Sequence, residues 1–288
     1  MIKNFFHIVR WPNLVMVGLI QVIIYSQLMV PSISALQFFD FSLLVLITIL
    51  IAASGYVIND YYDTHIDRIN QPKRWIAGNS WSLDLVKRVY FSLVFIGGIL
   101  AVVLAIRLGL LLYLILYPLA VIALWYYSYA LKCRPLAGNL IVAAFCAGVV
   151  MIIALPDWVR HNSRAIDIEI WFYMVFAFVS TLYREIVKDL EDAHGDQKLN
   201  CRTFVVRFGI QAGKMAAIVV GISLVAALLW WDSEQTGSTI KLVLLSLQGA
   251  IVASMALLWW ARDPTYYHYS STVIKVVMLA GTFLLFLM

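Results

Sequence analysis

Residues 59–67 read Asn59-Asp60-Tyr61-Tyr62-Asp63-Thr64-His65-Ile66-Asp67, and residues 188–196 read Lys188-Asp189-Leu190-Glu191-Asp192-Ala193-His194-Gly195-Asp196. Both stretches share the pattern Asp-x2-Asp-x3-Asp, and each aspartate of the second lies 129 residues after its counterpart in the first. Positions i, i+3 and i+7 lie on one face of an α-helix, so each stretch is expected to present three carboxylates in a row. Because such carboxylates repel one another unless a cation lies among them, the repeat predicts a divalent-metal site.

The composition is that of a membrane protein. Of the 288 residues, 63% are hydrophobic and only 13% are charged, and the mean hydropathy is +0.88. Soluble domains carry about 25% charged residues. The predicted fold class is therefore all-α, a polytopic membrane protein whose residues 1–288 form a single transmembrane domain. Its helices use up the whole length, so any chemistry must be done by the helices and their short connections.

Nine stretches are long and apolar enough to be membrane helices, which need about 20 mainly apolar residues. Four of these helices separate the two aspartate stretches, which suggests two similar halves, about 1–136 and 137–270, with a last helix appended. The predicted helices cover residues 12–30, 41–62, 88–106, 109–130, 138–156, 169–190, 210–231, 240–260 and 271–288.

The basic residues predict the orientation of the chain in the membrane. With the N-terminus inside, only Arg107, Arg160, Arg164 and Lys241 fall outside, which leaves 17 of the 21 Lys and Arg residues on the cytoplasmic side. Cytoplasmic loops carry the excess of Lys and Arg. We therefore expect a multi-pass protein of the cell membrane with its N-terminus in the cytoplasm and its C-terminus outside. Both aspartate stretches then lie at a cytoplasm-facing cavity, and the net charge of +5 reflects topology and not nucleic-acid binding.

The carboxylates suit a hard divalent cation. Mg²⁺ takes oxygen ligands, typically one or two carboxylates together with substrate phosphates, so it would bridge the protein to a diphosphate and neutralise that group as it leaves. Asn59 adds a neutral oxygen beside the first stretch. The catalytic residues are expected to be Asp60, Asp63, Asp192 and Asp196 together with Lys132, and Asn59 is expected to contact the substrate. The predicted metal ligands are Asp60, Asp63, Asp67, Asp189, Asp192 and Asp196.

Basic side chains surround both stretches. Arginine can clamp phosphate oxygens with two hydrogen bonds and lysine supplies a point charge, which is what a diphosphate leaving group needs. The predicted diphosphate-binding residues are Arg74, Lys132 and Lys188, with Arg10 preceding the first helix. The alternative role, as an anchor at the membrane surface, is preferred for other basic residues, namely Lys87, Arg88 and Lys214.

The three cysteines, Cys133, Cys146 and Cys201, show no paired spacing. Metal-binding and redox cysteines usually occur in closely spaced pairs. The sequence therefore predicts neither a disulfide nor a zinc site.

With these residues in hand, the chain resembles the UbiA superfamily of intramembrane prenyltransferases over nearly its whole length. Residues Asn59 to Asp67 look like the first aspartate-rich motif of that family, and Asp192-x3-Asp196 looks like the second. Tyr127 to Lys132 is similar to its Tyr/Lys signature, which implies that Tyr127 and Lys132 contact the substrate. The resemblance implies nine transmembrane helices, Mg²⁺, an isoprenyl diphosphate donor and a lipophilic acceptor.

Within that family the chain looks most like the branch that transfers a geranylgeranyl group to the free hydroxyl of geranylgeranylglycerol phosphate and so forms an ether lipid. Two alternatives remain open. One is prenylation of an aromatic ring in quinone biosynthesis by the same chemistry. The other is a divalent-cation transporter, although ion sites of transporters usually lie near the bilayer midplane and not at one mouth.

Overall fold

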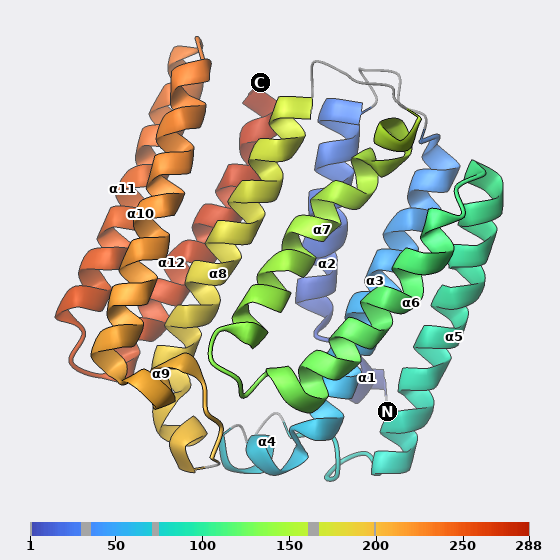
Figure 1. Cartoon of the computed structure of the whole chain (residues 1–288), viewed down its shortest axis with the longest axis horizontal. Helices are drawn as coiled ribbons and strands as arrows, with labels where there is room; N and C mark the ends of the chain where they lie inside the picture. Colours follow the sequence, from blue (N-terminus) through green and yellow to red (C-terminus); the bar gives the residue numbers. More distant parts are fainter. Residues whose placement is uncertain (1, 30–35, 71–74, 161–166, 199, 288) are drawn as a thin grey trace. The chain divides into compact units, whose positions relative to one another are not determined.

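The computed structural model describes residues 2–29, 36–70, 75–160, 167–198 and 200–287 (Figure 1). The chain divides into two compact units. The first contains Met1–Tyr25, Met29–Leu131 and Ile152–Asn162, and the second contains Ser26–Leu28, Lys132–Met151 and Ser163–Met288.

In the first unit, α3 runs alongside α5 and also packs against α2 and α6 (Figure 1). A short π-helix extends α2 and another, η2, extends α6, while α4 follows α3 almost directly. The unit also takes in the last part of α7. Its helices are α1 (Ile2–Ile8), α2 (Trp11–Ile24), the two end residues of η1 (Tyr25–Met29), α3 (Phe38–Tyr62), α4 (Thr64–Asn70), α5 (Leu83–Leu108), α6 (Leu112–Tyr126), η2 (Tyr127–Leu131) and the last part of α7 (Ala137–Val159).

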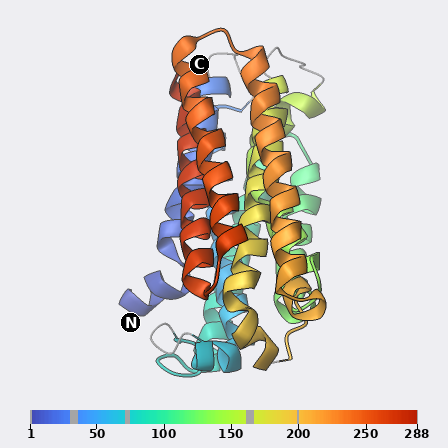
Figure 2. The same cartoon turned by 90° about the vertical axis from the view of Figure 1, so that its left-hand side faces the viewer.

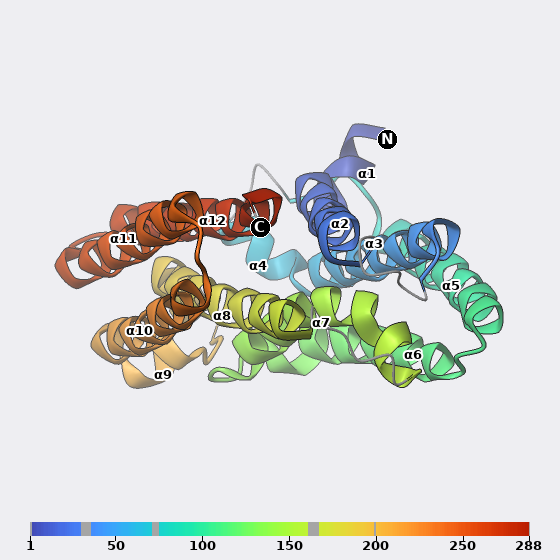
Figure 3. The same cartoon turned by 90° about the horizontal axis from the view of Figure 1, so that it is seen from above.

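In the second unit, α8 packs against α10 and α12, and α11 packs against the same two helices (Figures 2 and 3). The short helix α9 connects the end of α8 to the start of α10. The unit also takes in the first part of α7. Its remaining helices are α8 (Asp167–Lys198), α9 (Phe204–Phe208), α10 (Ile210–Glu234), α11 (Ser238–Trp260), α12 (Pro264–Phe283) and η3 (Leu284–Leu287).

Nine helices of the described part of the chain are long and apolar enough to cross a membrane, which confirms the predicted number. Two predicted boundaries were wrong by almost two turns. The helix expected to end at residue 190 continues to Lys198, and the one expected to begin at 271 begins at Pro264. Hydropathy detects where the apolar segment stops, whereas the backbone stays helical until its hydrogen bonds are capped.

Local sequence signals explain where several helices begin and end. Ser82 Oγ accepts a hydrogen bond from the Leu85 amide at 3.2 Å and so caps the start of α5. Gly109, with φ at 63°, ends the same helix in the left-handed conformation that glycine adopts without strain. Asp263 caps α12 by accepting from the Thr265 amide at 2.8 Å, and Pro264 occupies the first turn, where its missing N–H costs little.

Large apolar side chains cover the outside of these helices. Ile106 is 72% exposed and Leu242 is 68% exposed. In contrast, Trp231 is buried inside the second unit, where its ring stacks on Phe172 at 4.3 Å between centroids. Helices satisfy their own backbone hydrogen bonds, so an apolar outer surface is stable in lipid. This is the pattern of a polytopic membrane protein.

Candidate functional site

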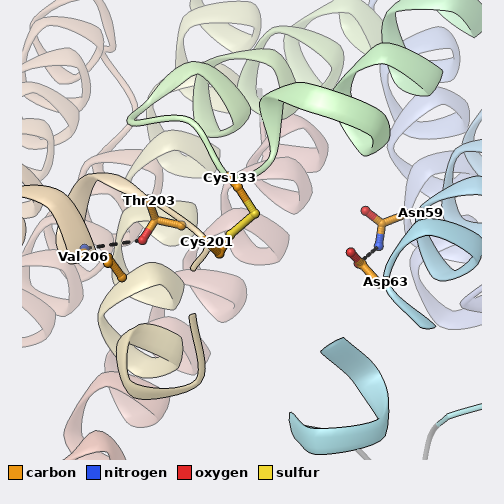
Figure 4. The surroundings of a disulfide bond; sticks show 6 residues. All are labelled: Asn59, Asp63, Cys133, Cys201, Thr203 and Val206. Atoms are coloured by element: carbon orange, nitrogen blue, oxygen red, sulfur yellow. Dashed lines mark hydrogen bonds between the residues drawn. A yellow bond between two sulfur atoms is a disulfide. The ribbon is translucent and has the colours of Figure 1, made fainter. Parts of the chain in front are cut away.

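The first carboxylate cluster lies at the end of α3. Asp60 and Asp63 are both buried, at 8% and 4% exposure. Asn59 Nδ2 donates a hydrogen bond of 2.6 Å to Asp63 Oδ2, one turn further along the helix (Figure 4). The amide thereby orients one carboxylate oxygen. Two carboxylates buried at the end of an apolar helix lose hydration, which costs free energy. Such groups in a membrane protein usually mark a functional site, so this end of α3 is a candidate for binding a ligand.

The third aspartate of the first stretch, Asp67, is not on the same helix. Helix α3 ends at Tyr62, Asp63 adopts φ −82° and ψ 1°, and Asp67 belongs to the separate short helix α4. The Asp67 amide still donates to the Asp63 carbonyl at 2.8 Å, so the break is one residue wide. The prediction of three carboxylates on one helical face was therefore wrong for this stretch, because spacing rules hold only while the helix continues.

Arg10 forms an ion pair with the first cluster. Its Nη2 lies 3.0 Å from Asp60 Oδ1, and its guanidinium lies 5.0 Å from the centre of the Tyr56 ring. Burial opposes the charge of Arg10, but Asp60, Tyr56 and Asp63 together outweigh it and raise the pKa of Arg10 above its usual value. Arg10 itself has φ 52°, a left-handed conformation that is unusual for a residue with a side chain. The chain thus holds a permanent cation beside Asp60.

The second cluster keeps the predicted geometry. Asp189, Asp192 and Asp196 all lie on α8, so they follow one face of a continuous helix. Asn139, near the start of α7, donates from Nδ2 to Asp189 Oδ2 at 3.0 Å. From the sequence, no role was assigned to Asn139. The feature that could have revealed it is an amide side chain at the start of an otherwise apolar helix. Each cluster therefore has one carboxylate held by an asparagine amide.

Two cations share one acid on α8, just before the second cluster. Glu185 Oε1 accepts from Arg184 Nη1 at 3.0 Å and from Lys188 Nζ at 3.2 Å. Lys188 lies one turn before Asp192, and both side chains project from the same face. Charged groups inside a membrane helix are costly unless paired, and they usually mark a functional path. The predicted diphosphate-binding Lys188 therefore lies beside the second cluster.

Two of the remaining predicted residues lie at and just after the end of α6. Tyr127 begins the π-helix η2, and Lys132 follows its last residue, Leu131. π-helical turns occur frequently at functional sites. Arg74 lies outside the described residues, so its contact with a substrate stays a prediction.

Aromatic rings surround the end of α3 within the first unit. Trp125 stacks on Tyr129 with centroids 5.4 Å apart, and Trp125 Nε1 donates to the Tyr62 hydroxyl at 3.1 Å. Tyr62 directly precedes Asp63. Ring faces attract cations, so these rings suit an allylic cation formed next to the carboxylates.

The donor set fits Mg²⁺, although the protein alone does not form a metal cage. Within the described ranges, no three His, Cys, Asp or Glu side chains are grouped closely enough to hold a metal ion. Mg²⁺ typically binds one or two carboxylates and completes its shell with water and substrate phosphates. The oxygen-only chemistry of Asp60, Asp63, Asp189, Asp192 and Asp196 therefore fits an ion that arrives with a diphosphate.

Cys133 and Cys201 form a disulfide, so the expectation of no disulfide was wrong (Figure 4). Their Cα atoms lie 4.7 Å apart, within the range that a disulfide can bridge. The two residues are 68 apart in sequence, so no local spacing could reveal the pair. Cys133 follows Lys132, and the Cys201 amide donates to the Asp196 carbonyl at 2.9 Å. The bond therefore joins the Lys132 loop to the end of the second cluster.

Replacing Cys133 and Cys201 together by Ser is expected to destabilise the protein by about 2–4 kcal/mol, because the crosslink restricts the unfolded chain. Thermal unfolding in detergent measures the loss, and a reductant should reproduce it in the wild type but not in the double variant. Cys146→Ser is the control, since Cys146 is free. Three titratable thiols in the unreduced wild type would contradict the pairing. Disulfides are rare in a reducing cytoplasm, so this thiol count also tests the predicted location of the loop.

The family of the chain follows from comparison with known proteins. The model of the UbiA prenyltransferase family matches residues 18–270. The chain therefore belongs to the UbiA prenyltransferase family, which confirms the resemblance drawn from the two aspartate stretches.

Among particular proteins, the chain is 36% identical over 172 residues to the digeranylgeranylglyceryl phosphate synthase of Methanosphaera stadtmanae. That match covers 59% of this chain and spans only 58% of the length of the relative.

Solved structures share the fold. One, described as giving structural and mechanistic insights into digeranylgeranylglyceryl phosphate synthase in membranes, has a TM-score of 0.73 at 21% identity and covers 99% of this chain and 96% of that chain. Another is a UbiA homolog from Archaeoglobus fulgidus bound to GPP and Mg²⁺, with a TM-score of 0.63 at 12% identity, covering 98% of this chain and 99% of that chain. At such identities the likeness establishes the fold alone.

Proposed function

We propose that this protein transfers a prenyl group from an isoprenyl diphosphate, geranylgeranyl diphosphate in the first instance, to the free hydroxyl of geranylgeranylglycerol phosphate. The observation that carries the proposal is the repeated carboxylate stretch, with cations beside it, at the ends of membrane helices in a UbiA-family chain. The name of the Methanosphaera relative, digeranylgeranylglyceryl phosphate synthase, supports the acceptor. The Archaeoglobus homolog, which binds GPP and Mg²⁺, supports the donor and the metal.

The aspartates of both stretches would hold Mg²⁺. When bound there, Mg²⁺ neutralises the charge that develops on the diphosphate as the bond to the prenyl carbon breaks. The candidate ligands are Asp60, Asp63, Asp67, Asp189, Asp192 and Asp196.

The chain's own groups position and balance the donor. Asn59 and Asn139 each hold one carboxylate of a cluster in place by an amide hydrogen bond, at 2.6 Å and 3.0 Å. Preorganised groups of this kind need no rearrangement when charge develops. The remaining negative charge of the diphosphate is balanced by Arg10, Arg74, Lys132 and Lys188, and Tyr127 contributes a hydroxyl.

Transfer requires that water be kept from the allylic cation, because water would capture it. In this proposal the isoprenoid tail lies along the apolar helices and the acceptor hydroxyl takes the cation. The stacked rings of Trp125 and Tyr129 provide an apolar wall next to Tyr62. In this proposal the N-terminus and the active site lie on the cytoplasmic side of the cell membrane and the C-terminus lies outside, which the excess of Lys and Arg in the cytoplasmic loops supports.

The test uses purified protein in detergent with radiolabelled geranylgeranyl diphosphate and Mg²⁺. Geranylgeranylglycerol phosphate is offered in one reaction, and 4-hydroxybenzoate or a dihydroxynaphthoate in others. The expected result is label in a diether phosphate and none in a ring. Label in a prenylated ring would overturn the proposed acceptor. No transfer to any acceptor, together with Mg²⁺ flux into proteoliposomes, would show that the protein is a transporter and not an enzyme.

A further inference from the structure

A hollow of about 400 Å³ lies beyond the end of α8, within the second unit. It is lined by Gln197, Asn200, Arg202, Val206 and Arg207. Small-molecule sites have volumes of about 300–1,000 Å³, so the hollow is large enough for a lipid headgroup. None of these residues belongs to the two carboxylate clusters.

Two positive charges line the hollow, those of Arg202 and Arg207. Within the described part of the chain, neither Arg202 nor Arg207 forms a salt bridge, and Arg207 lies over the ring of Phe208 at 5.3 Å from its centre. Each guanidinium presents five N–H donors in a planar fork that matches a phosphate. The side-chain amides of Gln197 and Asn200 add neutral donors. This lining suits a phosphate monoester.

Two contacts hold the backbone beside these donors, at Cys201 and at Thr203 (Figure 4). The disulfide holds Cys201, which lies between Asn200 and Arg202. Thr203 Oγ1 accepts from the Val206 amide at 3.5 Å and caps α9, while the Cys201 amide bonds to the Asp196 carbonyl. A backbone held at these points loses little conformational entropy when a ligand binds beside it.

The hollow also begins where the second carboxylate cluster ends, since Gln197 directly follows Asp196. In the acceptor proposed above, the reacting hydroxyl and the phosphate are carried by the same glycerol. A site for that phosphate must therefore lie close to the carboxylates that serve the reaction. We propose that the hollow binds the phosphate monoester of the lipid acceptor through Arg202 and Arg207, an assignment that rests on the proposed function.

The experiment compares the wild type with Arg202→Gln/Arg207→Gln in the full chain. We expect the KM for geranylgeranylglycerol phosphate to rise roughly tenfold to a hundredfold, because hydrogen bonds to a charged group are lost. The KM for geranylgeranyl diphosphate and the kcat at saturating acceptor should stay within about twofold. With the phosphate-free acceptor geranylgeranylglycerol, wild type and variant should become equal. Arg262→Gln, at an exposed arginine of the same unit, is the matched control.

Further measurements separate the possible sources of the phosphate. If the hollow held the headgroups of bulk lipids, the double variant would lose thermal stabilisation by phosphatidylglycerol nanodiscs relative to phosphatidylcholine nanodiscs and keep its acceptor KM, which would overturn the assignment. Glycerol 1-phosphate tests the hollow without catalysis. It should raise the Tm of the wild type and not that of the double variant, even if no prenyl transfer is found. An equal shift in both proteins would overturn the phosphate site itself.

Discussion

Asp63→Ala and Asp192→Ala are each expected to lower kcat/KM for prenyl transfer by at least roughly 10²–10³-fold, the loss seen when one electrostatic contact to developing charge is removed. Asp63 is buried and held by Asn59, so its carboxylate is aimed before the substrate arrives. Asp192 lies one turn after Lys188 on α8. In the proposed mechanism, removing either carboxylate takes away one oxygen ligand of the Mg²⁺ that accompanies the diphosphate. Initial rates with labelled geranylgeranyl diphosphate at several Mg²⁺ concentrations measure the effect.

Two acids outside the clusters serve as matched controls. Asp84→Ala removes an exposed carboxylate in the first turn of α5. Glu191→Gln removes a half-buried acid next to Asp192, whose partner at 3.0 Å is the exposed His268. Both variants should keep transfer within about twofold, since exposed pairs contribute little. Near-wild-type transfer by Asp63→Ala or Asp192→Ala at saturating Mg²⁺ would refute the assignment of these aspartates. Loss of prenyl transfer in only one of the two variants would show that the two aspartate stretches do not both contribute to catalysis.

Gly221→Leu is expected to destabilise the second unit by about 2–3 kcal/mol, the upper part of the usual range for overpacking a well-packed interior. A Cβ atom at Gly221 of α10 would lie 2.6 Å from Met255 Sδ and 2.9 Å from Tyr183 Cε2. Tyr183 is completely buried, and its hydroxyl bonds to Ser254 Oγ at 2.9 Å, which in turn bonds to Ser270 Oγ at 2.6 Å. The ring cannot move without breaking that network, so α10 would be pushed away.

Thermal unfolding in detergent should show the loss as a decrease in Tm of roughly 5–10 °C. Gly221→Ala should cost less, because the flexible Met255 side chain can give way while the larger leucine cannot be accommodated. Gly249→Leu on α11 is the control, since nothing lies within 4 Å of a Cβ at that position. Equal Tm values for Gly221→Leu and Gly249→Leu would show that α10 and α8 are less closely packed than the structure indicates.

Much of the fold was predictable because lipid imposes simple rules on a sequence. A membrane helix must be about 20 apolar residues long and must satisfy its own hydrogen bonds, so composition alone predicts nine spans. The ends were harder to predict. Hydropathy falls at Asp189, yet α8 continues to Lys198, because polar residues beyond the apolar segment remain good helix formers. The cap at Asp263 and the proline after it were present in the sequence and could have corrected the start of α12.

The candidate site, like the fold, was predictable from the sequence only in part. The repeated spacing identified the six aspartates, because side chains that recur at i, i+3 and i+7 share a face wherever a helix is continuous. The spacing could not show that the helix that carries the first stretch breaks at Asp63. Nor could it find Asn139, whose amide reaches Asp189 across 50 residues of sequence.

The sequence by itself determined the class of protein, the number of membrane helices and the candidates for the residues that carry the chemistry, since these depend on local composition and spacing. Tertiary structure alone decided the Cys133–Cys201 disulfide, the Arg10–Asp60 ion pair and the hollow beside Arg202 and Arg207. The disulfide and the ion pair join residues far apart in the chain, and the hollow depends on how the chain turns after α8. Such contacts form only when packing brings the segments together, so neither composition nor periodicity encodes them directly.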